Sequence, residues 1–262
     1  MKRKFFSILT LTLFACTLSF SFAYAAEKIT IPAHVDKKII IVDNFYVIPD
    51  DIILENAEVF RINTLENAIA DLRSGKAGAV IYDYNVLKYV AASNPDLDVL
   101  PDIYFKDGLV FIIDPGEPEL KRVVDAKIDE MTKNGQIDGM RSYWFSETGL
   151  TSKKPEVIIN IREAASDRSL TYGTFAVNEP FAFYGKDSEP MGYEIEMVEY
   201  FAQTLGIQLF VENMLPGQLL AAVEEGKIDM AGGFLANNPA LKNVLVSKPY
   251  FGSGLGMMIL KK

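Results

Sequence analysis

A few polar side chains stand where apolar runs end, and there they could bind a small molecule. Asp83 follows the run GAVIY at 78–82, and Asn178 and Asn237 also lie at the ends of predicted strands or in the loops after them. A carboxylate can hold a cation, while an amide both donates and accepts hydrogen bonds. Asp83 could equally be a solvated residue or cap the helix that follows it, and that structural alternative stays open. The residue types predict recognition of a small polar or cationic molecule.

Aromatic side chains accompany these polar groups. Phe175 and Phe234 fall at strand ends or in the loops that follow, and Tyr46 and Tyr82 could each add a hydroxyl or a ring face. Aromatic rings and a carboxylate can hold a cation without arginine. Packing in the core explains the two Phe residues equally well.

Composition excludes several classes of chemistry. The 262 residues include one Cys and one His, so we expect no metal cluster and no Cys/His nucleophile pair. The net charge of −9 argues against nucleic-acid binding. Glu179 and Asp83 could be imagined as an acid/base pair, but no activated nucleophile or phosphate loop accompanies them. We therefore expect no enzyme activity and no cofactor.

Residues 1–25 have the pattern of a secretory signal peptide. Three basic residues precede an apolar stretch, and Ala23-Tyr24-Ala25 forms a small-x-small cleavage site. A transmembrane anchor and a lipoprotein attached through Cys16 are the alternatives. The lipoprotein fits poorly because Phe14 departs from the required motif. The pattern predicts a periplasmic protein that carries, after cleavage, three fewer positive charges.

The remaining chain alternates predicted strands and helices, which is typical of α/β folds. Strands are predicted at 37–42, 57–62, 78–82 and 109–113, with helices after Asn63, near 85–92 and after Pro118. A polar connector at 146–168 interrupts the series. A second series follows, with strands at 170–175, 207–211, 228–231 and 250–260 and helices at 193–205 and 217–225.

Two segments echo one another. AIADLRSGKAGAVIYD at 68–83 and LLAAVEEGKIDMAGGF at 219–234 both contain a helix, a Gly-Lys stop and a buried strand. Two similar α/β lobes explain the echo economically, although many αβ turns contain glycine. Ligands of such sheets sit beyond the carboxyl ends of the strands, often between lobes.

Several sequence segments resemble the bacterial extracellular solute-binding proteins of family 3, the polar amino-acid-type periplasmic receptors. EPFAFYGKDSEPMGYEIEMVEYFAQTLGIQLFVE, VEEGKIDMAGG and VSKPYFGSGLGMMILKK are similar to the family's first half, over 170–262. TLENAIADLRSGKAGAVIYD and DGLVFIIDPGEPELKRVVDAKIDEMTKNGQIDGMRSYWF resemble its second half, over 36–145. The resemblance implies a two-lobed, type II periplasmic-binding-protein (Venus-flytrap) fold, without enzymatic activity.

The halves stand in reversed order, so the resemblance implies a circularly permuted member. We expect one lobe at 26–108, corresponding to the family's second lobe, and another at 109–262, corresponding to its first. A single covalent crossover is expected near 109–113, and the other crossover must be completed by non-covalent pairing of the two chain ends. A fragment of a tandem receptor is the alternative.

The resemblance also locates a binding pocket and a loss within it. An arginine that clamps a ligand carboxylate in the family corresponds to Ala240, and a neighbouring threonine corresponds to Asn237. Asp83 matches the aspartate that holds the ligand ammonium group, and Asn178 replaces an aromatic residue. Phe181 belongs to a Pro-Phe pair that looks structural.

Two functions remain in view. The first is a monomeric solute receptor that closes on a small molecule and delivers it to an ABC-type transporter. The second is a relative that has lost its ligand and acts in signalling or structure through a membrane partner, which the missing arginine favours.

Overall fold

The computed structural model describes residues 28–42, 53–54, 56–145 and 168–261. The predicted signal peptide, Tyr46 and almost all of the connector lie outside these residues. The strands are β1 (Lys28–Ile29), β2 (Lys38–Val42), β3 (Ile53–Leu54), β4 (Glu58–Ile62), β5 (Ala79–Asp83), β6 (Leu97–Val99), β7 (Tyr104–Ile113), β8 (Ser169–Thr174), β9 (Val177–Asn178), β10 (Ala182–Tyr184), β11 (Pro190–Met191), β12 (Gln208–Asn213), β13 (Met230–Leu235), β14 (Leu245–Val246) and β15 (Phe251–Leu260). The helices are α1 (Leu65–Arg73), α2 (Tyr84–Ala92), α3 (Pro118–Lys133), α4 (Gln136–Phe145), α5 (Tyr193–Leu205) and α6 (Pro216–Glu224).

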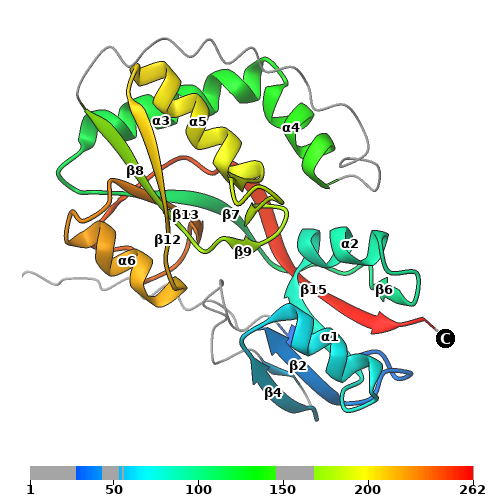
Figure 1. Cartoon of the computed structure of the whole chain (residues 1–262). Helices are drawn as coiled ribbons and strands as arrows, with labels where there is room; N and C mark the ends of the chain where they lie inside the picture. The colour runs from blue at the N-terminus through cyan, green and yellow to red at the C-terminus, as the bar shows by residue number, and fades with distance from the viewer. Residues whose placement is uncertain (1–27, 43–52, 55, 146–167, 262) are drawn as a thin grey trace, which may run out of the picture.

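The main sheet has two halves with the same topology. Its strand order is β12-β8-β13-β7-β15-β5-β2-β4. β12, β8 and β13 are parallel to one another, as are β4, β2 and β5, and β7 and β15 run antiparallel to their neighbours. In each half the first strand of the chain lies between the second and the third. Figure 1 shows the two halves as separate bodies joined by β7 and β15.

We call the part with β2, β4, β5, β6, α1 and α2 the small lobe, and the part with β8–β14 and α3–α6 the large lobe. The echo between 68–83 and 219–234 corresponds to α1–β5 in the small lobe and α6–β13 in the large lobe. Each helix is followed by a glycine in the left-handed region, Gly75 with φ 75° and Gly226 with φ 65°. A side chain with a Cβ atom would strain the backbone at both turns, which explains why glycine recurs there.

Helices of the large lobe pack against one another through their buried apolar faces. α3 buries Leu120, Val124, Ile128 and Met131. α4 packs against α3 and α5, and the Trp144 indole donates a hydrogen bond to Glu196 Oε2 at 2.8 Å. The helices at 118–145 therefore cover the lobe built from 169–246, as Figure 1 shows.

One local expectation differs from the structure. Thr64, not Asn63, caps α1, because its side chain accepts from the backbone N–H of Asn67. Two strands run between the lobes: β7 continues the chain from the small lobe into the large lobe, whereas β15 begins beside β7 at Phe251 and ends at Leu260 held to the small lobe by pairing with β5 and β6. The assignment of all of 109–262 to one lobe leaves this pairing out, and the lobe boundaries otherwise stay a prediction.

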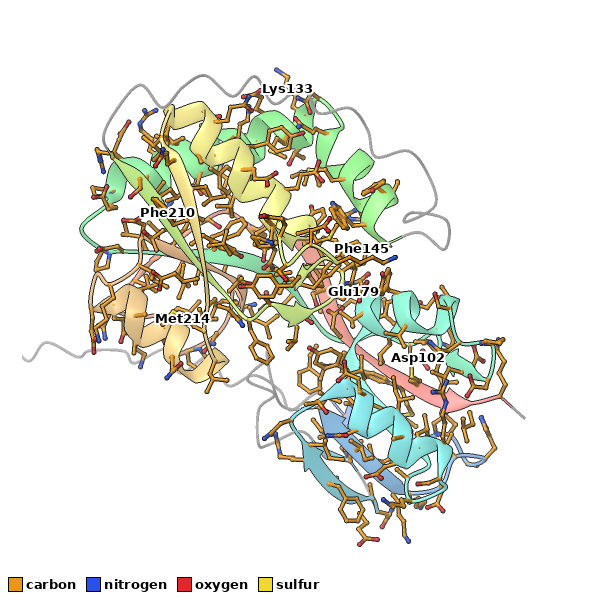
Figure 2. All side chains as sticks on the ribbon, viewed as in Figure 1. Asp102, Lys133, Phe145, Glu179, Phe210 and Met214 are labelled. Carbon is orange, nitrogen blue, oxygen red and sulfur yellow. The ribbon has the colours of Figure 1, made fainter. Side chains whose placement is uncertain are left out.

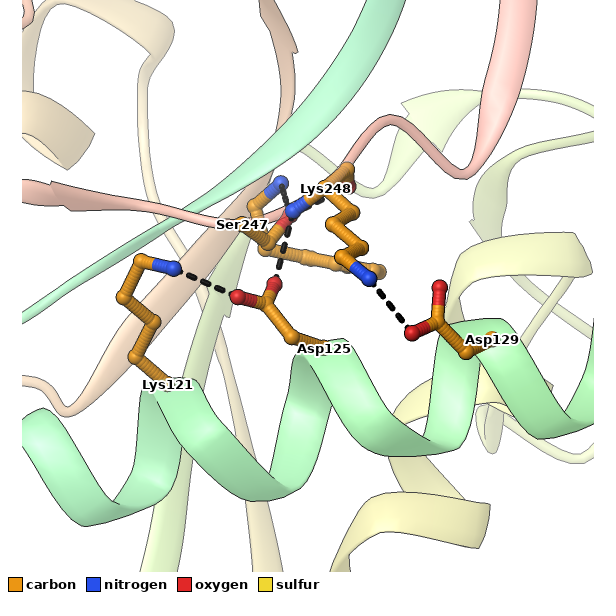
Figure 3. A network of polar contacts seen from close by, with 6 residues as sticks. Lys121, Asp125, Asp129, Ser247 and Lys248 are labelled. Atoms are coloured by element: carbon orange, nitrogen blue, oxygen red, sulfur yellow. Dashed lines mark hydrogen bonds and ion pairs between the residues drawn. The ribbon is translucent and has the colours of Figure 1, made fainter.

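A polar network holds the segment before β15 to α3 (Figure 3). The backbone N–H of Lys248 donates to Asp125 Oδ1 at 2.7 Å, and its ammonium group pairs with Asp129. Ser247 Oγ accepts from the N–H of Phe111 in β7 at 2.9 Å. The ammonium pair is exposed and contributes little. The backbone contacts fix where β15 starts relative to β7.

Glu194 of α5 is a buried acidic residue that contacts Tyr250, the residue directly before β15. Tyr172 donates to its Oε2 at 3.0 Å, Tyr250 donates to its Oε1, and the N–H of Gly233 donates to Tyr250 at 3.0 Å. Burial raises the pKa of Glu194 from 4.5 to about 7, although both tyrosine hydrogen bonds lower it. The folded state therefore favours the protonated form more than the unfolded state does.

This shift predicts that stability falls with rising pH. The stabilisation is complete below the unfolded pKa of 4.5 and is lost as the pH passes through about 7. Denaturant unfolding should give a free energy about 2–3 kcal/mol lower at pH 8 than at pH 5 from this group. Glu194→Gln should remove that difference, whereas Glu66→Gln on the exposed face of α1 should retain it. An unchanged pH dependence in Glu194→Gln would contradict the assignment.

Candidate functional site

The lobes meet where β5 ends in the small lobe and β9 lies in the large lobe. The Tyr82 hydroxyl donates to Asn178 Oδ1 at 3.1 Å, and the two side chains are 1% and 4% exposed. Among the described residues, the Asn178 amide nitrogen is buried and has no hydrogen-bond partner. Leaving such a donor unpaired costs about 1–3 kcal/mol, so it needs an explanation beyond packing. Two of the sequence-predicted binding residues are thus brought together from different lobes.

Asp83 lies at the same end of β5, but its side chain is fully buried. One carboxylate oxygen accepts from the N–H of Val86 at 2.9 Å and caps α2, and the other accepts from the Ser253 hydroxyl of β15. The expected place at a solvent-filled cleft is therefore not observed. The carboxylate joins the start of α2 to a connecting strand, which is the structural alternative that the sequence left open.

The other predicted binding residues contact separate parts of the large lobe and the connecting strand β7. Asn237 is exposed, and its N–H and amide group both donate to Asp107 of β7, at 3.0 and 3.1 Å. Phe234 is half-buried against the cluster that contains Leu219 and Val223. Phe175 is half-buried just beyond β8. Phe181 is fully buried in the core, as its structural assignment predicted.

Ala240, at the position of the family arginine, lies in an exposed turn. Its N–H donates to Asn238 Oδ1 at 2.9 Å. A methyl group offers no hydrogen bond to a carboxylate, so this turn cannot form the charge-assisted pair that an arginine would make.

Sequence reasoning missed a second contact between the lobes. The Tyr89 hydroxyl of α2 donates to Glu179 Oε1, next to β9, at 2.7 Å. Figure 2 shows Glu179 at the junction, facing the small lobe. Tyr89 and Glu179 are 90 positions apart, and no local pattern in the sequence links them. Glu179 and Asp83 bind different partners, so the imagined acid/base pair has no support in this geometry.

The described residues contain neither a helix suited to a membrane span nor a cluster of metal-ligating side chains. Within 28–42, 53–54, 56–145 and 168–261, no helix combines the length and apolar character that a membrane span requires. In the same part of the chain, no three His, Cys, Asp or Glu side chains are grouped as metal ligands would be.

Residues 170–262 match the family model for bacterial extracellular solute-binding proteins, family 3. The match confirms the predicted resemblance for this part of the chain. Together with the duplicated halves joined by two strands, it identifies the α/β fold as the two-lobed fold of periplasmic binding proteins. A comparison with curated protein sequences gives no match.

Solved structures with similarity to the chain include three solute-binding proteins or domains. The L-cystine receptor of Neisseria gonorrhoeae, unliganded and open, is 21% identical over 34% of this chain and 37% of its own, with a TM-score of 0.27. The GluR0 ligand-binding core with L-glutamate is 12% identical over 88% and 87%, with a TM-score of 0.43. An ancestral amino-acid-binding protein, a precursor of cyclohexadienyl dehydratase, is 12% identical over 78% and 65%, with a TM-score of 0.41.

The buried contacts of Asp83 predict that it stabilises the fold. Asp83→Ala removes the cap of α2 and leaves the Ser253 hydroxyl buried without this acceptor, so unfolding should become easier by about 2–4 kcal/mol. Thr64→Ala removes the more exposed cap of α1 and should cost about 1 kcal/mol. Denaturant unfolding of both variants measures the difference, and equal losses would show that the buried hydrogen bond to Ser253 contributes nothing.

Proposed function

We propose that the protein is a periplasmic solute-binding protein that captures a small polar molecule between its lobes. The observation that carries the proposal is the meeting of Tyr82 and Asn178 across the junction, with one buried amide donor unpaired. A receptor of this kind must contact its ligand from both lobes, because binding has to favour the closed form. The family match over 170–262 supports a ligand-binding role.

The contacts favour a neutral polar ligand over a cationic one. Both oxygens of Asp83 accept hydrogen bonds from the protein, so its carboxylate is already satisfied. The Asn178 amide can donate to a carbonyl, a hydroxyl or an ether oxygen on the ligand. The absence of a cation at Ala240 argues against a free carboxylate, since burying an unpaired carboxylate is costly.

Delivery to an ABC transporter is the partnership that this class of protein suggests. The signal peptide predicted at 1–25 and the family's usual location support a periplasmic site of action. The reversed order of the halves supports a circularly permuted receptor, and we include a monomeric state in the proposal. These assignments are part of the same proposal.

A receptor that has lost its ligand is the second candidate. Its support is the pairing of Asn237 with Asp107, together with Ala240 at the clamp position. A polar side chain that already binds a connecting strand is less available to a ligand. Such a protein would act on a membrane partner through the arrangement of its lobes.

Ligand-induced stabilisation separates the two candidates. We expect glutamine, arginine and simple amines to leave the melting temperature unchanged, and one member of a panel of neutral amides and polyols to raise it. A ligand at 100 times its Kd adds about 2.7 kcal/mol, which raises the melting temperature by roughly 5 °C or more. Asn178→Leu should abolish the shift, while Asn67→Ala on the exposed face of α1 should preserve it.

The choice between the two candidate functions rests on the melting temperatures measured with every compound of the panel. A panel without any stabilising compound would favour the receptor that has lost its ligand. Tight binding of an ordinary amino acid would show that another group replaces the arginine.

A further inference from the structure

In the part of the chain that the structure describes, side-chain hydrogen bonds join the lobes in addition to the pairing of β7 with β15. Tyr82 donates to Asn178 in the buried interior of the junction, and Tyr89 donates to Glu179 at its accessible rim. Each pair joins a tyrosine of the small lobe to a polar side chain beside β9 in the large lobe. Both are direct contacts between the chain's own groups, so neither requires a molecule between the lobes.

Hydrogen bonds at the start of α2 fix the helix in the position from which Tyr89 reaches Glu179. Asp83 caps the helix and accepts from Ser253 of β15, and the Asn85 amide donates to the carbonyl of Gly252 at 3.3 Å. Asn85 and Tyr89 are four residues apart and share one helix face. The start of α2 is thus fixed to a connecting strand, and the Tyr89 hydroxyl reaches from this base to the large lobe.

The connecting strands themselves are irregular where they pair. Their register shifts between Ser253 and Leu255, and Phe105 has a φ of 49°, in the left-handed region. Irregular backbone at element ends absorbs the dihedral changes of a hinge. A rotation there would separate the tyrosines from their partners while the backbone stayed continuous.

We propose that the Tyr89–Glu179 and Tyr82–Asn178 pairs form a latch that holds the two lobes closed in the absence of any ligand. The Tyr82–Asn178 pair adjoins the hinge, because Tyr82 of β5 pairs with Gly256 of β15, whereas Tyr89 reaches Glu179 from α2. Both hydrogen bonds form in the closed arrangement and break on opening. The latch raises the population of the closed form and thereby sets the apparent affinity for anything that binds between the lobes. Its existence does not depend on the identity of a ligand.

Removing one hydroxyl should open the molecule measurably. A net hydrogen bond is worth about a fivefold change in an equilibrium, so Tyr89→Phe should lower the ratio of closed to open molecules by about that factor. Glu179→Ala should have the same effect, and the double variant should open no further than either single variant because both remove one interaction. Tyr82→Phe combined with Tyr89→Phe should open the lobes more than Tyr89→Phe alone.

Pulsed electron–electron double resonance between two nitroxide labels, one in each lobe, measures the distance between the lobes. Labels at Asn67→Cys in α1 and Lys133→Cys at the end of α3 lie on exposed positions of different lobes, and Cys16→Ser removes the one native thiol. No ligand is added, so a failed ligand screen leaves this test intact. Tyr184→Phe is the matched control because it removes an exposed hydroxyl within the large lobe.

The expected result is a dominant short distance in the wild type and in Tyr184→Phe, with a longer distance gaining population in Tyr89→Phe. Far-UV circular dichroism and melting curves verify that each variant is folded. Distance distributions that coincide for the wild type, Tyr89→Phe and Glu179→Ala overturn the latch. A wild type that shows mainly the long distance also overturns it.

Discussion

The antiparallel pairing of β7 with β15 determines where the other parts of the molecule lie. Leu109 pairs with Phe251 and Gly108 with Gly252, and every further strand of the main sheet is added outward from this pair on one side or the other. Each half then repeats the order of three parallel strands, so the carboxyl ends of β5 and β8 come to the same junction. The meeting of Tyr82 and Asn178 follows from this backbone arrangement and not from local sequence.

Three buried polar groups near this pair are satisfied in different ways. Glu194 receives two tyrosine hydroxyls, Asp83 receives a helix N–H and the Ser253 hydroxyl, and Asn178 receives only Tyr82. The first two therefore contribute to a fixed structure. Asn178 keeps a buried amide donor without a hydrogen-bond partner among the described residues, which is why the proposed binding role is assigned to it.

The elements could be predicted from the sequence because their patterns are local. The apolar run at 78–82, the helical spacing of α3 and the glycines after α1 and α6 each identify an element from neighbouring residues. The contacts of the site could not be predicted in this way. The carboxylate of Asp83 is compatible with a ligand or a cap, and Ser253, which decides between them, lies 170 residues away. Tyr89 and Glu179, 90 residues apart, gave no joint signal.

This separation along the chain has a consequence for how the protein folds. The sheet of the small lobe is assembled from strands at 38–83, yet the strand that covers β5 comes from 255–258. A contact between residues so distant in sequence requires closure of a long loop, and the chain loses that conformational entropy before the contact stabilises it. Folding that depends on such contacts is therefore slow. The small lobe cannot complete its sheet until the large lobe has placed β15. Completion of the small-lobe sheet therefore depends on β15, and the large sequence separation between β5 and β15 is expected to slow this step.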